Sequence, residues 1–353
     1  MQKLTKLRNK LADQDLDGIL VTNPYNRRYI TGFTGSAGVV LITQNEAIFI
    51  TDFRYVTQAK EQADGYTIIQ HEKSIVEEIA NQIERLGIGR LGFEENDITY
   101  ADYSIYQSAF QTELIPTSQI IETIRLIKNE EELTVLREAA TIADETFNHI
   151  VNFIQPGMTE IEVANELEFY MRKLGATSSS FDIIVASGFR SALPHGVASE
   201  KKIQTGELIT MDYGAWYKGY CSDITRTIAV GDVSDELKTI YDTVLNAQIK
   251  GVEGTKAGLT GKAADQLTRE YITDKGYGQY FGHSTGHGLG LEVHELPRLA
   301  PRAEQVLEPG MVVTIEPGIY VPEVGGCRIE DDIVIKEDGN ELLTHAPKDF
   351  IQI

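Results

Sequence analysis

The chain has 353 residues, 42% of them hydrophobic, and a formal net charge of -21 at pH 7. This length exceeds the size at which one hydrophobic core usually stops growing, so we expect two domains. The strong negative charge argues against a general nucleic-acid-binding or membrane-surface role, because both require a basic face.

The first stretch, MQKLTKLRNKLADQDLDGILV, indicates an amphipathic helix and not a secretion signal. Leu4, Leu7 and Leu11 share one helical face and alternate with charged residues, whereas a signal needs an uninterrupted apolar run. No later stretch approaches the about 20 apolar residues of a membrane span. The two cysteines, Cys221 and Cys327, are too few for a disulfide framework. We therefore expect a cytoplasmic protein without a membrane partner.

Residues 1–122 predict an N-terminal mixed α/β domain. Short β-rich runs begin near residues 18, 38, 47, 66 and 90, and they alternate with helical patterns near 53–63 and 74–86. This alternation is typical of a sheet packed against helices. The polar segment NPYNRRYITGFTGS, between two of the β-rich runs, indicates turns and packing.

Residues 123–353 predict a second domain made of two similar halves. Each half has the order helix, helix, β-hairpin. Thr159 and Glu162 have the spacing of a capping box, and Thr260 is a suitable N-cap. The repeat is one of pattern only, because the two halves share little sequence identity. The helical patterns run from Leu133 to Ile150 and over 159–174 in the first half, and over 235–250 and 260–275 in the second.

The hairpin of the first half places two aspartates at equal distances from its expected tip. Asp212 and Asp223 flank Tyr217 and Lys218, and Gly219 supplies the conformational freedom of a turn. Symmetric pairing would bring the two aspartates face to face, with Cβ atoms about 5 Å apart. Like charges opposed in this way are destabilising, so we expect something positive between them.

The hairpin of the second half repeats the arrangement with glutamates. Glu316 and Glu330 flank a tip near Glu323, again at equal distances. All four acids adjoin apolar residues, as in LITMD, VVTIE and CRIED, which indicates half-buried strands. Four such carboxylates need compensating charge, and two divalent cations would supply it.

Residues 282–295, GHSTGHGLGLEVHE, contain three histidines: His283, His287 and His294. A helix is disfavoured here, because each of four glycines would cost a helix interior up to about 1 kcal/mol. We expect an extended or turn conformation held close to another element. One of these histidines completes an oxygen-rich ligand set, which suits manganese, cobalt or iron better than a cysteine-rich structural zinc.

Together these residues resemble the pita-bread metallopeptidases, specifically the Xaa-Pro peptidases prolidase and aminopeptidase P. The family pattern is an Asp, a second Asp eleven residues on, a His between glycines, a Glu within TIEPG and a Glu after an Arg, and all five positions are filled. The resemblance spans the whole chain. It implies a creatinase-like N-terminal domain, a pita-bread C-terminal domain and two divalent ions, with manganese favoured and cobalt, zinc or iron as alternatives. The implied metal ligands are Asp212, Asp223, His287, Glu316 and Glu330.

The resemblance also implies roles for the residues around the ligands. His195 and His294 match histidines that hold the substrate amide and relay a proton, and Glu316 is also implied to accept a proton. The implied reaction is hydrolysis of the Xaa-Pro bond, a tertiary amide without an N–H, in small peptides with proline at the second position. The residues implied to line the substrate pocket are Phe181, His283, Tyr320 and Arg328.

We expect an Xaa-Pro dipeptidase, with aminopeptidase P acting on longer peptides as the alternative. A methionine aminopeptidase would normally lack the N-terminal domain, and a creatinase-type hydrolase lacks the ligand set. A two-metal phosphatase is disfavoured because no glycine-rich phosphate loop opens a helix. A non-catalytic peptide-binding module is a remote alternative, since such modules generally lose the ligands. The family resemblance also suggests a homodimer.

Overall fold

A computed structural model describes residues 2–353 and divides the chain into two compact units, Met1–Arg125 and Leu126–Ile353. We expected the boundary after residue 122, and the separation falls at the end of helix α6 (Ile120–Arg125). Within residues 2–353, none of the helices combines the length and apolar character that a membrane crossing requires.

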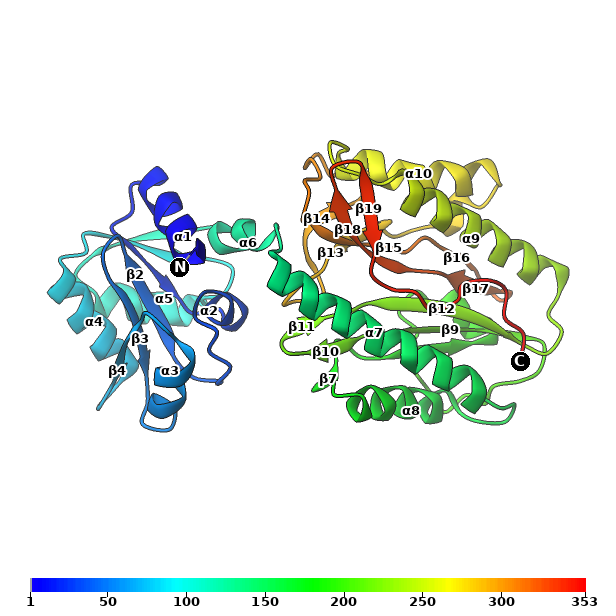
Figure 1. Cartoon of the computed structure of the whole chain (residues 1–353), viewed down its shortest axis with the longest axis horizontal. Coiled ribbons are helices and arrows are strands. Elements are labelled where there is room, and N and C mark those ends of the chain that lie inside the picture. Colours follow the sequence, from blue (N-terminus) through cyan, green and yellow to red (C-terminus); the bar gives the residue numbers. More distant parts are fainter. Residues whose placement is uncertain (1) are drawn as a thin grey trace. The chain divides into compact units, whose positions relative to one another are not determined.

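The first unit is a six-stranded mixed sheet with helices packed against it, as predicted (Figure 1). The strand order is β4-β3-β2-β1-β5-β6, and β1 pairs antiparallel with β2 but parallel with β5. Leu20, Leu41 and Ile83 lie in its buried core. The elements are α1 (Gln2–Asp13), β1 (Gly18–Val21), α2 (Pro24–Thr31), β2 (Val39–Thr43), β3 (Ala47–Thr51), α3 (Val56–Gln62), β4 (Thr67–Gln70), α4 (Ile75–Leu86), β5 (Arg90–Glu94), α5 (Tyr100–Ala109), β6 (Glu113–Thr117) and α6.

The polar segment after β1 contains a helix, α2, where the sequence indicated only turns and packing. The Asn23 side chain accepts hydrogen bonds from the backbone N–H groups of Tyr25 and Asn26, so it caps the helix. Pro24 occupies the first turn, and Gly32 ends the helix with a φ of 77°. The helix is short and mostly polar, so its hydrophobic period is too weak to detect in the sequence.

The second unit contains the two predicted helix, helix, hairpin halves. Figure 1 shows its strands between α8 on one side and α9 and α10 on the other. The predicted capping box of Thr159 and Glu162 is present, and the Thr260 hydroxyl accepts the N–H of Ala263. The elements are α7 (Glu130–Phe153), α8 (Glu160–Lys173), β7 (Ser178–Ser179), β8 (Ile184–Ser187), β9 (Glu207–Tyr213), β10 (Ala215–Tyr217), β11 (Tyr220–Cys221), β12 (Ile224–Val230), α9 (Asp235–Gly254), α10 (Gly261–Asp274), β13 (Gly286–Gly288), β14 (Glu295–Leu299), β15 (Val312–Ile315), β16 (Gly318–Val321), β17 (Gly325–Arg328), β18 (Asp331–Lys336) and β19 (Gly339–Leu342), with 3₁₀ turns η1 (Gly188–Ala192) and η2 (Gly278–Tyr280).

The register of the first hairpin differs from the predicted one by two residues. Asp212 lies opposite Thr225, not opposite Asp223. The reason is the turn, which consists of Lys218 and Gly219, one residue later than expected. Both residues have positive φ, 50° and 89°, as a type I′ turn requires. The two aspartates are therefore diagonal neighbours, which leaves more room between them than direct opposition would.

The second hairpin has the predicted register. Strand β15 pairs with β18, and β16 pairs with β17, in one common register. Glu316 and Glu330 fill the gap between these two pairs of strands, so the register places them opposite each other. The chain reverses at Glu323, which has a positive φ of 66°. The symmetric arrangement of the glutamates is therefore confirmed.

Candidate metal centre and active site

A cavity of about 560 Å³ in the second unit brings together residues from both hairpins and from the histidine segment. All five residues implied as metal ligands line it. Tyr320 lies beyond the lining and forms hydrogen bonds with two of the lining residues, His283 and Arg328. The lining also contains these predicted residues: Phe181, His195, His283, His294 and Arg328.

Asp223, His287 and Glu330 form the tightest group in the cavity. Each offers a ligand atom, and these atoms all lie within 4.8 Å of one another. Nε2 of His287 is 3.7 Å from Asp223 Oδ2 and 3.3 Å from Glu316 Oε1. Asp212 lies in the same cavity, where its carboxylate accepts a hydrogen bond from Arg328. Glu316 lies beside this group and Asp212 lines the same cavity, so all five side chains face one space in which cations could bind.

Three of the carboxylates each have one buried oxygen without a hydrogen-bond partner among residues 2–353: Asp212 Oδ1, Asp223 Oδ1 and Glu330 Oε1. A buried carboxylate oxygen without a partner is costly, so oxygens of this kind grouped in one cavity indicate a cation-binding site. The donors are carboxylate oxygens and one imidazole nitrogen, without a thiolate. Such a set fits hard to borderline divalent cations. The residues present therefore fit a divalent metal centre.

Burial shifts the protonation of these groups. It raises the pKa of Glu316 to about 8, and burial with the neighbouring Glu330 and Asp212 raises the pKa of Asp223 well above its usual range. Burial lowers the pKa of His287 to about 4, so its ring is neutral near pH 7. Nδ1 of His287 lies 3.0 Å from the carbonyl oxygen of Gly288. Because a carbonyl can only accept, Nδ1 carries the proton and Nε2 keeps its lone pair for a metal.

Side chains around the ligands hold them in place, and sequence reasoning did not identify these side chains. The Thr314 hydroxyl accepts the N–H of His287 and donates to Glu316 Oε1, both at 3.1 Å. The Thr225 hydroxyl donates to Glu330 Oε2 at 2.6 Å. A fifth buried carboxylate, Asp332, accepts the N–H of Asp223 at 2.9 Å. Each lies two residues from a ligand along a strand, which was the signal available in the sequence.

The histidine segment is extended at His287, as predicted, and its glycines allow close approach to two neighbouring strands. A Cβ atom on Gly286 would collide with the carbonyl oxygen of Thr314, and one on Gly288 with that of Leu296. Strand β13 lies between β14 and β15. The glycines therefore let the imidazole reach the ligand cluster from a strand that is flanked on both sides.

We expected positive charge beside the aspartates, and part of it comes from a side chain of the protein, Arg328. Its side chain is 4% exposed, and its guanidinium donates to the Asp212 carboxylate. It also donates to the Tyr320 hydroxyl at 2.7 Å, to the Thr225 hydroxyl at 3.1 Å and to the Pro194 carbonyl at 3.1 Å. Arg328 thus supplies one positive charge to the ligand cluster, and its donors are occupied by protein groups.

His294 and His195 line the cavity and are more exposed than the ligands. The rings of His294 and His287 are 4.4 Å apart and nearly perpendicular. Burial lowers the pKa of His294, so this ring is also biased toward its neutral form. Arg298, which the sequence analysis did not select, lines the same cavity and is exposed. Its position in HELPRL, four residues after His294, was the available signal.

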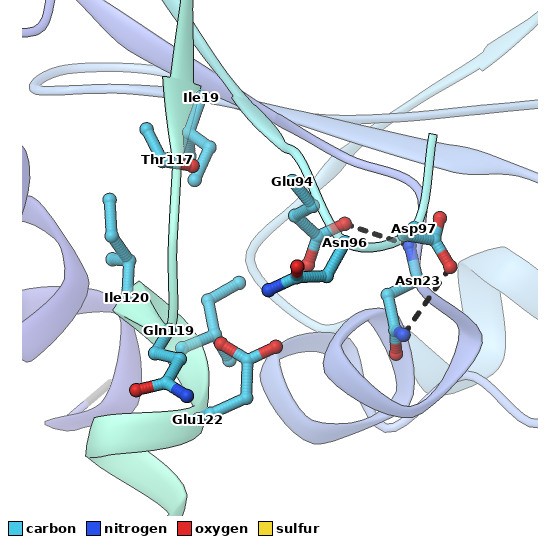
Figure 2. Close-up of a pocket in the computed structure, with 10 residues that line it drawn as sticks. Ile19, Asn23, Glu94, Asn96, Asp97, Thr117, Gln119, Ile120 and Glu122 are labelled. Atoms are coloured by element: carbon cyan, nitrogen blue, oxygen red, sulfur yellow. Dashed lines mark hydrogen bonds between the residues drawn. The ribbon is translucent and has the colours of Figure 1, made fainter. Parts of the chain in front are cut away.

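A much smaller hollow, of about 50 Å³, lies in the first unit (Figure 2). Its carboxylates are used within the fold. Glu94 accepts the backbone N–H groups of Thr22 and Asn23 and the side-chain amide of Asn26, and Asp97 accepts the Thr22 hydroxyl. The hollow has room for about one or two water molecules. It does not compete with the larger cavity as a substrate site.

Known proteins match the chain along its whole length. Residues 134–337 match the metallopeptidase family M24, and residues 3–127 match the creatinase/prolidase N-terminal domain. An Xaa-Pro dipeptidase of Pyrococcus horikoshii is 41% identical over 353 residues, with 99% of each chain covered. The structure of an Xaa-Pro dipeptidase from Bacillus anthracis is 62% identical with a TM-score of 0.99, covering 100% of this chain and 99% of that one. The structure of an X-Pro aminopeptidase from Thermotoga maritima is 40% identical with a TM-score of 0.91, covering 96% and 98%.

Proposed function

Because the chain belongs to metallopeptidase family M24, we propose that it is a metal-dependent hydrolase of Xaa-Pro bonds, and specifically an Xaa-Pro dipeptidase. The single observation that carries this proposal is the cavity in which four carboxylates and one neutral imidazole converge. Its volume of about 560 Å³ lies in the usual range for small-molecule sites. The relatives named Xaa-Pro dipeptidase support the choice of substrate.

Asp212, Asp223, His287, Glu316 and Glu330 would hold two divalent ions. When bound, such ions would lower the pKa of a coordinated water molecule and polarise the substrate carbonyl. We propose manganese as the native ion, because the donors are mainly oxygen with a single imidazole, and keep cobalt, zinc and iron as alternatives. Metal analysis of the purified protein by mass spectrometry checks this choice.

Glu316 is the residue that we propose as the proton acceptor. Its carboxylate lies in the cavity with Oε1 3.3 Å from Nε2 of His287, and a carboxylate positioned in this way can take a proton and return it. Thr314 donates to Oε1 of Glu316 and so restricts its orientation. The proton passes from the attacking water to Glu316 and then to the leaving nitrogen of proline. His294 and His195, both in the cavity wall, would hold the substrate amide.

The proline ring needs an apolar, uncharged surface. Phe181 and His283 line the cavity. Burial lowers the pKa of His283 to about 4, so its ring is neutral at physiological pH and can pack against the pyrrolidine. We propose that these two rings form the proline-binding wall. An Xaa-Pro bond differs from other peptide bonds because its nitrogen carries no hydrogen. Binding through these two rings does not require an N–H at the scissile bond.

We propose Arg298 as the group that binds the carboxylate of a dipeptide. Arg328 is less suitable, because its guanidinium already donates to four protein groups. Arg298 lines the cavity and is exposed, and its side chain has no hydrogen bond or ion pair to the described part of the chain. A guanidinium binds a carboxylate with two parallel hydrogen bonds. An arginine in this position favours substrates that end at proline.

The test compares Ala-Pro with Ala-Pro-Ala, each with and without manganese. We expect manganese-dependent cleavage of Ala-Pro and weaker cleavage of Ala-Pro-Ala. Arg298→Met should raise KM for Ala-Pro by about tenfold or more, as loss of a charge-assisted contact of about 1.5 kcal/mol implies. Arg302→Met removes an exposed arginine outside the cavity lining and should leave KM unchanged. Cleavage of the tripeptide alone would instead make the protein an aminopeptidase P, and cleavage of neither would reject the Xaa-Pro assignment.

A homodimer and a cytoplasmic location are further parts of the proposal. The dimer rests on the family resemblance, and light scattering of the metal-loaded protein at two concentrations tests it. The location agrees with the state of Cys221 and Cys327, which are both buried free thiols. Cell fractionation followed by immunodetection tests the location.

A further inference from the structure

Helix α10 carries an ion pair that contacts the histidine segment. Asp265 is fully buried, and Arg269 lies one turn further along the helix. The guanidinium grips the carboxylate with two hydrogen bonds, from Nε to Oδ2 at 2.6 Å and from Nη2 to Oδ1 at 2.8 Å. The Arg269 side chain is partly exposed, but the buried carboxylate of Asp265 offsets its desolvation only if further hydrogen bonds complete the pair. Those further bonds go to residues 281–285.

Arg269 holds two backbone carbonyls of this segment. Its Nη1 donates to the carbonyl of Phe281 at 3.0 Å, and its Nη2 donates to the carbonyl of His283 at 2.7 Å. The guanidinium also lies 4.3 Å from the centre of the Phe281 ring. Between the two carbonyls, Gly282 has open space around its Cβ position within the described residues. Packing therefore does not fix the chain at Gly282, and the guanidinium clamps it on both sides.

Asp265 connects helix α10 to Glu316, a proposed metal ligand, through Thr285. Its Oδ1 accepts the backbone N–H of Thr285 at 3.0 Å and the Thr285 hydroxyl at 2.9 Å. The carbonyl of Thr285 in turn accepts the backbone N–H of Glu316 at 2.8 Å. A short series of hydrogen bonds thus connects α10 with the backbone of Glu316.

The ring of His283 depends on the same backbone. Its Nδ1 lies 2.8 Å from the carbonyl oxygen of Ser284, and its Nε2 lies 2.8 Å from the Tyr320 hydroxyl. A carbonyl only accepts, so Nδ1 carries the proton, and Nε2 accepts from Tyr320. The Tyr320 hydroxyl can donate to this nitrogen because it accepts from Arg328. A shift of the 283–284 backbone would break this arrangement and change the tautomer.

We propose that Asp265 and Arg269 are positioning residues, which hold residues 281–285 so that the His283 ring and Glu316 keep their places in the cavity. The kinetic part of this inference rests on the proposed function. Neither residue lines the cavity, so both act through the segment that they hold. Arg269 bonds to the carbonyls of Phe281 and His283, whereas Asp265 holds Thr285 and through it Glu316. Loss of the guanidinium alone therefore disturbs the His283 side of the proposed proline-binding wall, and weakens substrate binding more than the chemical step.

The kinetic test uses Arg269→Lys. Lysine keeps a positive charge beside Asp265, which protects the fold, but a single ammonium group lacks the planar fork that spans the carboxylate and two carbonyls. We expect KM for Ala-Pro to rise about tenfold while kcat changes by less than about threefold. In a His283→Ala background the same substitution should change KM by less than about twofold, because the two residues act as one unit.

The matched control is Arg172→Lys. Arg172 also pairs with a carboxylate one turn away on its helix, Glu168, and also donates to a backbone carbonyl, that of Thr177. It lies on α8, outside the cavity lining. The KM of the Arg172→Lys variant for Ala-Pro should stay within about twofold of the wild-type value. An equal rise in KM for Arg172→Lys, or equal effects of Arg269→Lys with and without His283, would overturn the inference.

A second measurement needs no substrate. Nitrogen-15 spectra of histidine-labelled protein, with the His283 signals assigned from His283→Gln, report the tautomer of this ring. The wild type should show a single Nδ1–H form, and Arg269→Lys should show a mixture or a shift. Unchanged His283 signals in Arg269→Lys would refute the positioning role. If the signals change but the wild type cleaves no Xaa-Pro peptide, the positioning pair stands and the proposed function falls.

Discussion

Raising the pH of the metal-stripped protein from about 5.5 to about 7.5 should destabilise its second unit. Burial raises the pKa of Glu316 from 4.5 to about 8. Between these two pH values the folded protein retains a proton on Glu316 that the unfolded chain has released. The contribution of this proton to the free energy of unfolding is fully present below about pH 4.5 and is lost as the pH rises toward about 8. Burial also raises the pKa values of Asp223, Glu330 and Asp332, which adds to the effect with the same sign. Burial lowers the pKa values of His283, His287 and His294, which acts in the opposite direction below about 6.5, but the four carboxylates outnumber these histidines and act over the whole range.

The size of the effect follows from the number of retained protons. One proton held only by the folded state lowers the free energy of unfolding by about 1.4 kcal/mol for each pH unit. Over two pH units Glu316 alone accounts for about 3 kcal/mol, or roughly 5 to 10 °C in Tm for a unit of this length. Bound divalent ions replace the protons, so the manganese-loaded protein should show a much flatter pH dependence.

The pH dependence of Tm is measured by thermal unfolding followed by circular dichroism. The measurements are made at several pH values, with chelator or with manganese. Glu316→Gln has no proton to retain, so in the stripped protein it should flatten the pH slope by about 1.4 kcal/mol per unit. Glu337→Gln, at an exposed site between β18 and β19, should keep the wild-type slope. A stripped protein whose Tm stays constant or rises over this range, or a Glu316→Gln slope equal to the wild type, would refute the reasoning.

Substitutions at three positions test the ligand cluster and its support. Asp223→Asn should abolish metal-dependent hydrolysis while the far-ultraviolet dichroism stays unchanged, and full residual activity would contradict the two-metal site. Thr314→Val should lower kcat/KM about 10- to 100-fold, because His287 and Glu316 lose a shared partner; Thr314→Ser should retain most activity, and equal losses in both would exclude the hydroxyl as the cause. Gly286→Ala should lower the free energy of unfolding by about 1 to 3 kcal/mol in urea titrations, because its Cβ meets a neighbouring carbonyl, and an unchanged midpoint would show that the strands can part there.

Local chemistry explains why much of the site was predictable. The Thr159–Glu162 capping box and the symmetric second hairpin depend on residues close together in the chain, so their signals survive in the sequence. The same holds for the glycines around His287, whose spacing disfavoured a helix. The error in the first hairpin was also local. Placing the tip on Tyr217 and Lys218 neglected the need for positive φ at both central residues, which Lys218 and Gly219 satisfy.

Other parts of the site depend on contacts between distant segments. Arg328 and Asp212 are joined by a hydrogen bond although 116 residues separate them. The sequence called for a positive group near the aspartates, but it did not show that part of that charge comes from the chain itself. Arg269 also has no local signal, because its bonds to Phe281 and His283 cross from one element to another.

The sequence by itself determined the family, the two helix, helix, hairpin halves of the second unit and the identity of the acidic and histidine residues that line the cavity, because these follow from residue type, spacing and short-range conformation. Only the tertiary structure decided which of those residues share a cavity, which oxygens are left without partners, and which side chains hold them in place. The physical reason is that burial and hydrogen-bond satisfaction are properties of the packed chain, and both are set by groups that meet only after folding.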